Sequence, residues 1–438
     1  MAGPRGDEHG IITDKPTAFD HQMSLQGIEP LPDSPYAWRR LMVTLAIMTV
    51  GASGMYIVPV VIPAVQAEFG VARADASLPY SMLMLGFGIG GFLYGRIADR
   101  LGVWVCLVSG GAMLGAGYWV SAHAPNMFVF NAAHGLLIGL LGSSCTFAPL
   151  MADTSLWFER RRGIAVAICA SGNYLGGTIW PPVIQHFVEQ VGWRQTYIAM
   201  GFVCSVSIML LALLMRRRPP VVVAPPSSVG GGRVPLASAT PFGLSLTSAQ
   251  GLLMLAGIAC CVAMSMPQVH IVAYCGDLGY GAARGAEMLS LMLGFGIVSR
   301  LFSGWICDHI GGLKTLLLGS ALQGVALLLF LPFNGLVPLY VISGLFGLFQ
   351  GGIVPAYAII VREHFPANEA GWRVGAVIMC TLMGMALGGW MSGKVFDVTG
   401  SYKAAFVNGI AWNLVNLSIV VFLLRGAKRN AHPRLQRA

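Results

Sequence analysis

The stretch "LMLGFGI" occurs twice in the chain, at Leu83–Ile89 and again at Leu291–Ile297. Each copy is followed by one loop pattern, in which glycine, aspartate and glycine are separated by three and two residues. This pattern reads "GRIADRLG" at 95–102 and "GWICDHIG" at 304–311. A short match in Gly- and Leu-rich sequence can arise by chance, but a match that continues into the same loop pattern indicates an internal repeat. The two halves of the chain are therefore expected to share one architecture.

The rest of the sequence is a series of long apolar runs. Of its 438 residues, 55% are hydrophobic and only 10% are charged, against about 25% charged in a soluble domain. A run of about 18 or more apolar residues predicts a membrane-spanning helix. The sequence therefore predicts an all-α membrane protein of twelve transmembrane helices in two pseudo-symmetric six-helix halves. The expected spans lie near 41–63, 77–98, 103–122, 126–151, 163–186, 194–215, 249–275, 284–306, 313–332, 335–361, 373–396 and 404–424.

The basic residues cluster between alternate apolar runs, and this placement decides how the net charge of +9 is interpreted. Cytoplasmic loops of membrane proteins collect Lys and Arg. Clusters such as Arg160–Arg162 and Arg216–Arg218 therefore predict the cytoplasmic side, and no nucleic-acid partner is expected. Both termini then lie in the cytoplasm, which requires an even number of crossings. The predicted division is a cytoplasmic tail at 1–38 without a signal peptide, halves at 39–215 and 249–424, a Pro- and Gly-rich linker at 216–248 and a tail at 425–438.

The loop at 95–102 resembles the signature loop of the major facilitator superfamily, and this resemblance extends from Leu41 to Leu424. A narrower resemblance is to the monocarboxylate transporter family and its bacterial oxalate/formate antiporter relatives. It is carried by "WFERRRGIAVAICASGNYLGG" at 157–177 and "MPQVHIVAYCGDLG" at 266–279. The resemblance implies the major facilitator fold and transport of a small organic anion, a mono- or dicarboxylate, by alternating access. The lack of extensive external loops favours a bacterial inner membrane.

Arg300 is the most informative single residue of the sequence. It precedes Asp308 by eight positions, so it lies about 12 Å deeper along the same predicted helix. An arginine at that depth costs at least a few kcal/mol unless it faces water or a partner. In a central cavity its planar fork would bind a carboxylate in bidentate geometry. The alternatives are an internal salt bridge and snorkelling of the side chain to the cytoplasmic surface.

The family resemblance supports the anion role of Arg300 and also shows two departures. Arg300 aligns with the arginine of helix 8 that such transporters use for the carboxylate. Gly296, one turn earlier, stands where the family carries a proton-exchanging carboxylate. Val60 stands near the place of a family lysine in helix 1. These departures count against proton coupling by the usual family route. They also favour a substrate other than lactate or pyruvate. Proton coupling by another route and exchange of anions both stay open.

Several other side chains are candidates for the substrate site. His270 follows Pro267, and a proline frees a backbone carbonyl and can bend a helix beside a cavity. A histidine there could bind substrate or exchange a proton near neutral pH, or it could simply bond to a neighbouring helix. His134 in the fourth span has the same two interpretations. The remaining substrate-binding candidates are polar side chains on cavity-forming helices, each of which could instead be a packing residue: Tyr56, Asn173, Tyr174 and Tyr357.

The repeated loop pattern supplies the candidate gating residues. Asp99 is expected just past a helix end, where a carboxylate can pair with arginine or cap a neighbouring helix. With Arg96 and Arg100 it would latch the inward-closed state of the carrier. Asp308 is its equivalent in the second half.

The sequence offers little support for other classes of protein. Gly86, Gly88 and Gly91 match a dinucleotide-binding pattern, but they lie in a spanning helix with no strand before it. No nucleophile and base recur in an accessible pattern, so no enzyme activity, cofactor or metal is expected. The nine cysteines form no paired or metal-binding spacing. A monomeric transporter in the lipid bilayer is expected. One alternative is an efflux transporter for amphipathic molecules. A second is a non-transporting sensor, which would need a signalling domain, and the predicted tail and linker are too short to hold one.

Overall fold

The computed structural model describes residues 32–217, 241–366 and 369–435, and every regular element in these ranges is helical. The tail predicted at 1–31 and most of the predicted linker, at 218–240, lie outside the described residues. The first half contains α2 (Pro35–Gly51), α3 (Ser53–Phe69), α4 (Arg73–Leu101), α5 (Val103–Ala122), α6 (Met127–Ala132), η1 (Ala133–Leu140), η2 (Ser143–Thr146), α7 (Ala148–Trp157), α8 (Arg162–Val191) and α9 (Trp193–Leu213). The second half contains η3 (Pro241–Gly243), α10 (Leu246–Asp277), α11 (Ala282–Ile310), α12 (Gly312–Leu329), α13 (Leu336–Gln350), α14 (Ile353–His364), α15 (Ala370–Thr399) and α16 (Tyr402–Leu435).

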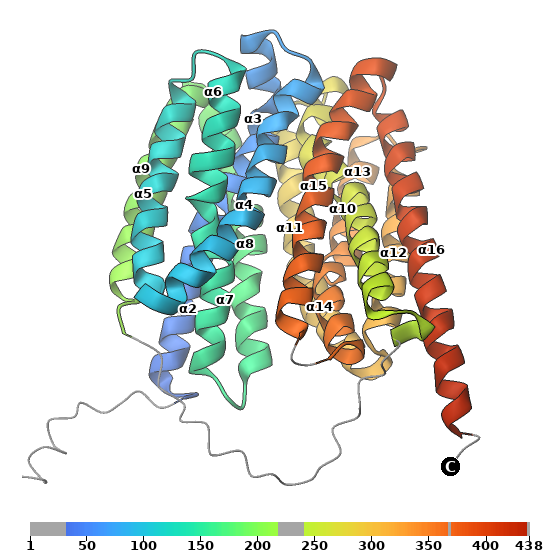
Figure 1. Ribbon diagram of the computed structural model, residues 1–438. Helices are drawn as coiled ribbons and strands as arrows, with labels where there is room; N and C mark the ends of the chain where they lie inside the picture. Colours follow the sequence, from blue (N-terminus) through green and yellow to red (C-terminus); the bar gives the residue numbers. More distant parts are fainter. Residues whose placement is uncertain (1–31, 218–240, 367–368, 436–438) are drawn as a thin grey trace, which may run out of the picture.

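These elements form twelve membrane-length paths in two bundles that stand side by side (Figure 1). Three paths are broken into shorter pieces, at α2–α3, at α6–α7 and at α13–α14. Eleven paths in the described residues are long and apolar enough to span a membrane. The twelfth, α8, is 30 residues long but carries polar residues and the pair Pro181 and Pro182. It packs against α2, α3 and α11, so much of its surface faces other helices. The predicted all-α fold of two six-helix halves is confirmed.

Glycines end equivalent helices in the two halves. Gly102 follows α4 and Gly311 follows α11, with φ of 87° and 83°, a backbone conformation that favours glycine. The repeated loop pattern therefore encodes one turn, used twice. The prediction that Asp99 lies just past a helix end is wrong, because α4 continues to Leu101 and Asp99 lies in its last turn. No helix-breaking residue stands between Ala98 and Gly102, so the helix runs on to the glycine.

The breaks within the long paths occur where backbones approach closely. A Cβ atom built on Gly86 or on Gly90 would lie 2.1 Å from a backbone oxygen of the broken path α6–α7. Only glycine permits α4 to approach that path so closely. In this region the fourth path changes from α-helix to the π-helix η1 and then to the 3-10 helix η2, and such breaks are frequent at functional sites.

Buried charge within the first half is paired. Arg40 at the start of the first path and Asp153 in α7 form an ion pair of 3.0 Å, with side chains only 3% and 8% exposed. Both Arg40 Nε and Nη2 donate to the Asp153 carboxylate. The two residues are 113 positions apart in sequence, and the pair joins two paths of the same half. It is therefore an ion pair within the first half and not a contact between the halves.

Candidate substrate site and gates

Arg300 lies at the junction of the two halves. It belongs to α11 and is partly buried. Its Nη1 donates to the backbone oxygen of Ala170 in α8, at 3.1 Å, and its Nε lies 3.4 Å from the oxygen of Gly351 between α13 and α14. One contact therefore reaches the first half and the other stays in the second. The guanidinium has more donors than these two contacts use.

The charge of Arg300 is met by a ring and not by a carboxylate. Its guanidinium carbon lies 4.3 Å from the centre of the Tyr174 ring, a cation–π contact. None of the ion pairs between residues of the described ranges includes Arg300. The predicted salt-bridge alternative is therefore not what the structure shows.

The structure gives a steric reason for Gly296, the residue one turn before Arg300. A Cβ atom built on Gly296 would lie 2.3 Å from Cε1 of Tyr174 and 2.5 Å from its Cδ1. The tyrosine ring occupies the space that any side chain at this position would need. Retreat of the backbone is also blocked, because the oxygen of Gly296 packs closely against Gly351. Glycine at position 296 therefore leaves the space that the ring of Tyr174 needs in order to lie next to Arg300.

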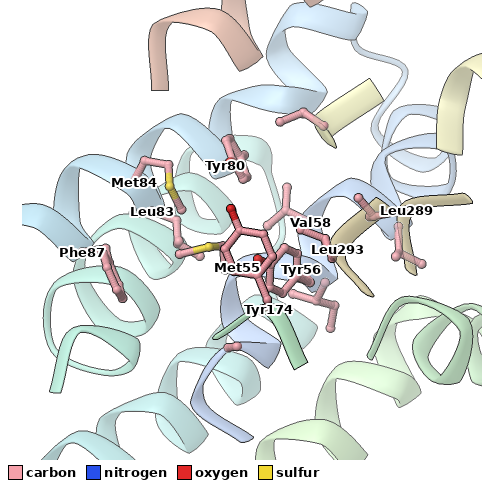
Figure 2. Packing of buried hydrophobic residues seen from close by; sticks show 14 of the residues in the cluster. Met55, Tyr56, Val58, Tyr80, Leu83, Met84, Phe87, Tyr174, Leu289 and Leu293 are labelled. Atoms are coloured by element: carbon pink, nitrogen blue, oxygen red, sulfur yellow. The ribbon is translucent and has the colours of Figure 1, made fainter. Parts of the chain in front are cut away.

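The predicted candidates Tyr56, Asn173 and Tyr174 lie together. Tyr56 in α3 donates from its hydroxyl to Oδ1 of Asn173 at 2.9 Å. Figure 2 shows Tyr56 and Tyr174 in one buried cluster with Tyr80, a residue that the sequence reasoning did not single out. Tyr80 comes from α4, so three helices of the first half each contribute one tyrosine. Leu289 and Leu293 of α11 complete the cluster from the second half.

Two other predicted candidates lie in different surroundings. Tyr357 in α14 is fully buried in a separate apolar cluster of the second half and donates to Asn416 Oδ1 at 3.2 Å. His270 is also fully buried, with Nε2 at 2.8 Å from the oxygen of Gly389 and Nδ1 at 3.3 Å from the hydroxyl of Tyr402. Both side chains are satisfied by helices of their own half, which is the packing alternative considered for each. His134 is likewise bonded, to Phe130 and Tyr197.

The predicted gating residues are exposed. Arg96, Asp99, Arg100 and Asp308 all lie on the surface of the described ranges, and none of them takes part in an ion pair there. Arg96 lies over the ring of Phe92, 4.2 Å from its centre. No group of three or more potential metal ligands occurs in the part of the chain that the structure describes. Among the described residues, the ion pair that joins the two halves lies instead at the opposite end, where α4 begins, between Arg73 and Asp277.

Two similar six-helix halves are an architecture of secondary transporters. The sequence matches the Major Facilitator Superfamily over residues 43–337 and 288–438, and the chain belongs to that superfamily. It is similar to monocarboxylate transporter 13 of Rattus norvegicus, with 27% identity over 80% of this chain and 78% of the relative. It is also similar to the MFS-type transporter YcxA of Bacillus subtilis, with 24% identity over 81% and 87% of the two chains.

Solved structures show the same fold at low sequence identity. A variant of the nucleoside transporter NupG superposes with a TM-score of 0.70 and 12% identity, covering 87% of this chain and 99% of that one. The peptide transporter POT in complex with sulfate gives 0.69 and 15%, covering 91% and 97%. These similarities confirm the fold. The superfamily match gives the transporter class, which does not contain enzymes, and the relatives named monocarboxylate transporters are distant, at 27% identity.

Proposed function

We propose that this transporter carries a small organic anion, a mono- or dicarboxylate, and that Arg300 binds the carboxylate. The observation that carries the proposal is the guanidinium of Arg300 at the junction of the halves, held by two backbone oxygens and a tyrosine ring. A carboxylate approaching the remaining donors would neutralise the charge and form a charge-assisted contact. The distant relatives named monocarboxylate transporters favour the same substrate class.

Neighbouring side chains would define the rest of the site. Tyr174 orients the guanidinium through its ring, and Tyr56 holds Asn173, the residue before Tyr174 in α8. Because Tyr174 fills the space beside Gly296, the site has no acidic side chain one turn before Arg300. The energy for transport would come from an ion gradient or from exchange of one anion for another. The lack of extensive external loops favours a bacterial inner membrane, and the distribution of Lys and Arg favours both termini in the cytoplasm.

Uptake of labelled acids into vesicles that contain the purified protein tests this proposal. The panel contains formate, oxalate, lactate, pyruvate, succinate and benzoate, with a cationic amphipathic dye as the competing substrate class. Arg300→Ala is compared with Arg284→Ala, because Arg284 is an exposed arginine of the same helix that pairs with Glu287. We expect uptake of at least one acid, lost only in Arg300→Ala. Dye transport without uptake of any acid would refute the anion assignment and favour efflux of amphipathic molecules.

A further inference from the structure

The two ends of the bundle differ in how the halves contact each other. At the end that contains Gly102 and Gly311, the residues predicted to form the gate are exposed and unpaired in the described ranges. At the opposite end, α4 of the first half begins directly against the last turn of α15 of the second half. The carboxylate of Asp397 accepts hydrogen bonds from the backbone N–H groups of Arg73 at 2.8 Å and of Ala74 at 2.9 Å.

This contact caps a helix from another part of the chain. The first N–H groups of a helix have no partner within the helix, and a negative charge there is stabilised by the helix dipole. Capping is normally local, from the residue just before the helix. The residue at that position of α4 is Ala72, whose side chain cannot accept a hydrogen bond. Asp397, more than 320 residues away in sequence, performs this role across the junction.

The side chain of Arg73 inserts into the second half at the same place. Its Nη1 donates to the hydroxyl of Tyr402 at 2.8 Å, and its Nη2 pairs with Asp277 at 3.2 Å. The guanidinium also lies 4.8 Å from the centre of the Phe396 ring, and the residue is only 7% exposed. These partners come from α10, α15 and the start of α16, so a single arginine contacts three helices of the other half.

Close packing below these polar contacts indicates a fitted surface. A Cβ atom built on Gly393 would lie 2.8 Å from Cα of Ala74, and one built on Gly389 would lie 3.1 Å from Cδ1 of Tyr80. Directly after Tyr80 in α4, Ser81 donates from its hydroxyl to the oxygen of Ala386 at 2.5 Å. Small residues on α15 therefore let α4 approach along about two turns.

His270 supports this surface from behind. Its Nε2 faces a carbonyl, so it carries the proton and donates to Gly389. Its Nδ1 is then free to accept from the hydroxyl of Tyr402, whose oxygen in turn accepts from Arg73. The predicted substrate candidate His270 is thus a neighbour of this contact.

We propose that Arg73 and Asp397 form a latch between the two halves, which keeps this end of the transporter closed and must open before the substrate site can face this side. Alternating access requires the halves to separate at one end as they meet at the other. Opening here would return two helix N–H groups, a carboxylate and a guanidinium to water together. The strength of the latch therefore sets the ratio of carriers closed and open at this end. The latch rests on the transporter fold and is independent of the anion proposal.

Distances between spin labels at both ends of the purified protein test the latch without a substrate. Exposed positions at the Arg73 end are His123 in the first half and Pro332 in the second, each changed to cysteine. At the other end the pair is Arg161→Cys and Lys314→Cys, also at exposed positions. The nine native cysteines are buried. The protein without introduced cysteines, treated with the same spin label, gives the background signal. Asp397→Ala removes the cap, and Arg73→Gln keeps the backbone donors but loses the paired charge.

The matched control is Glu68→Gln at the same end, because Glu68 pairs with Arg194 and Trp193 within the first half only. We expect Asp397→Ala to raise the ratio of long to short distances at the Arg73 end about tenfold, with the converse change at the other end. Arg73→Gln should shift the ratio in the same direction, and Glu68→Gln should leave it unchanged. If Asp397→Ala does not fold, Asp397→Asn, which keeps one acceptor, should give a smaller shift of the same sign. Unchanged distances in the folded Asp397 variant, an equal shift in Glu68→Gln, or a wild type without the short distance would overturn the latch.

Discussion

Replacement of Gly296 by alanine tests how the candidate site is built. The added Cβ atom would lie 2.3 Å from Tyr174, whereas ordinary contacts begin at 3.4 Å, so the ring must move by 3.4 − 2.3 = 1.1 Å. The ring is rigid and the backbone of Gly296 is held against Gly351, so neither side yields easily. Overpacking of this kind costs about 1–3 kcal/mol. The movement would also take the ring away from the guanidinium of Arg300 and weaken anion binding.

Alanine at 296 also gains helix propensity, about 1 kcal/mol relative to glycine, and this gain has to be measured separately. Gly304 provides the control, because it lies in the same helix with no atom near its built Cβ. Unfolding by titration with a denaturing detergent should show Gly296→Ala to be about 1–3 kcal/mol less stable than Gly304→Ala. In a chain that also carries Tyr174→Ala, this difference should disappear. Equal stability of the two alanine variants, or no rescue by Tyr174→Ala, would show that the ring does not occupy this space.

Two further variants test the other charged residues. Asp99→Asn should lower the transport rate while leaving stability and membrane level unchanged. Asp99 is exposed in the last turn of α4, so it would act on the balance between carrier states. Wild-type turnover of this variant would remove Asp99 from the mechanism. Asp153→Ala should lower the free energy of unfolding by about 3–5 kcal/mol, because it leaves the buried charge of Arg40 uncompensated. The double change Arg40→Met with Asp153→Leu should cost less, and an equal or larger loss would contradict this explanation.

Features that depend on local sequence could be predicted well. The apolar runs and the repeated "LMLGFGI" gave the twelve paths and two halves, and the paired glycines at 102 and 311 marked equivalent turns. The ends of the helices were predicted less well, because polar residues in the last turns do not stop a helix when no breaker is present. Asp99 is the example, since α4 continues past it to Gly102.

Features that depend on packing between distant segments could only be proposed as alternatives. The depth of Arg300 followed from its spacing to Asp308, but its actual neighbours Ala170 and Tyr174 come from the other half. Pro267 near His270 suggested a side chain beside a cavity. The hydrogen bonds of His270 to Gly389 and Tyr402 depend on the packing of α15 and α16 around it.

The contact between Arg73 and Asp397 was missed for the same reason. Sequence reasoning did not single out Arg73, and a separation of 324 positions between Arg73 and Asp397 gives no local signal of their contact. A hint was available in the first turn of α4, where the sequence offers no local capping side chain at Ala72.

The central claim is that Arg300 binds the carboxylate of the transported anion, and thermal stabilisation of the purified protein by its best acid tests it most directly. A ligand that binds only the folded protein raises its melting temperature by mass action. We expect the wild type to be stabilised, Arg300→Lys to need a higher concentration because it keeps the charge without the planar fork, and well-folded Arg300→Ala to show no stabilisation. Stabilisation of Arg300→Ala at the same acid concentration as the wild type would contradict the claim.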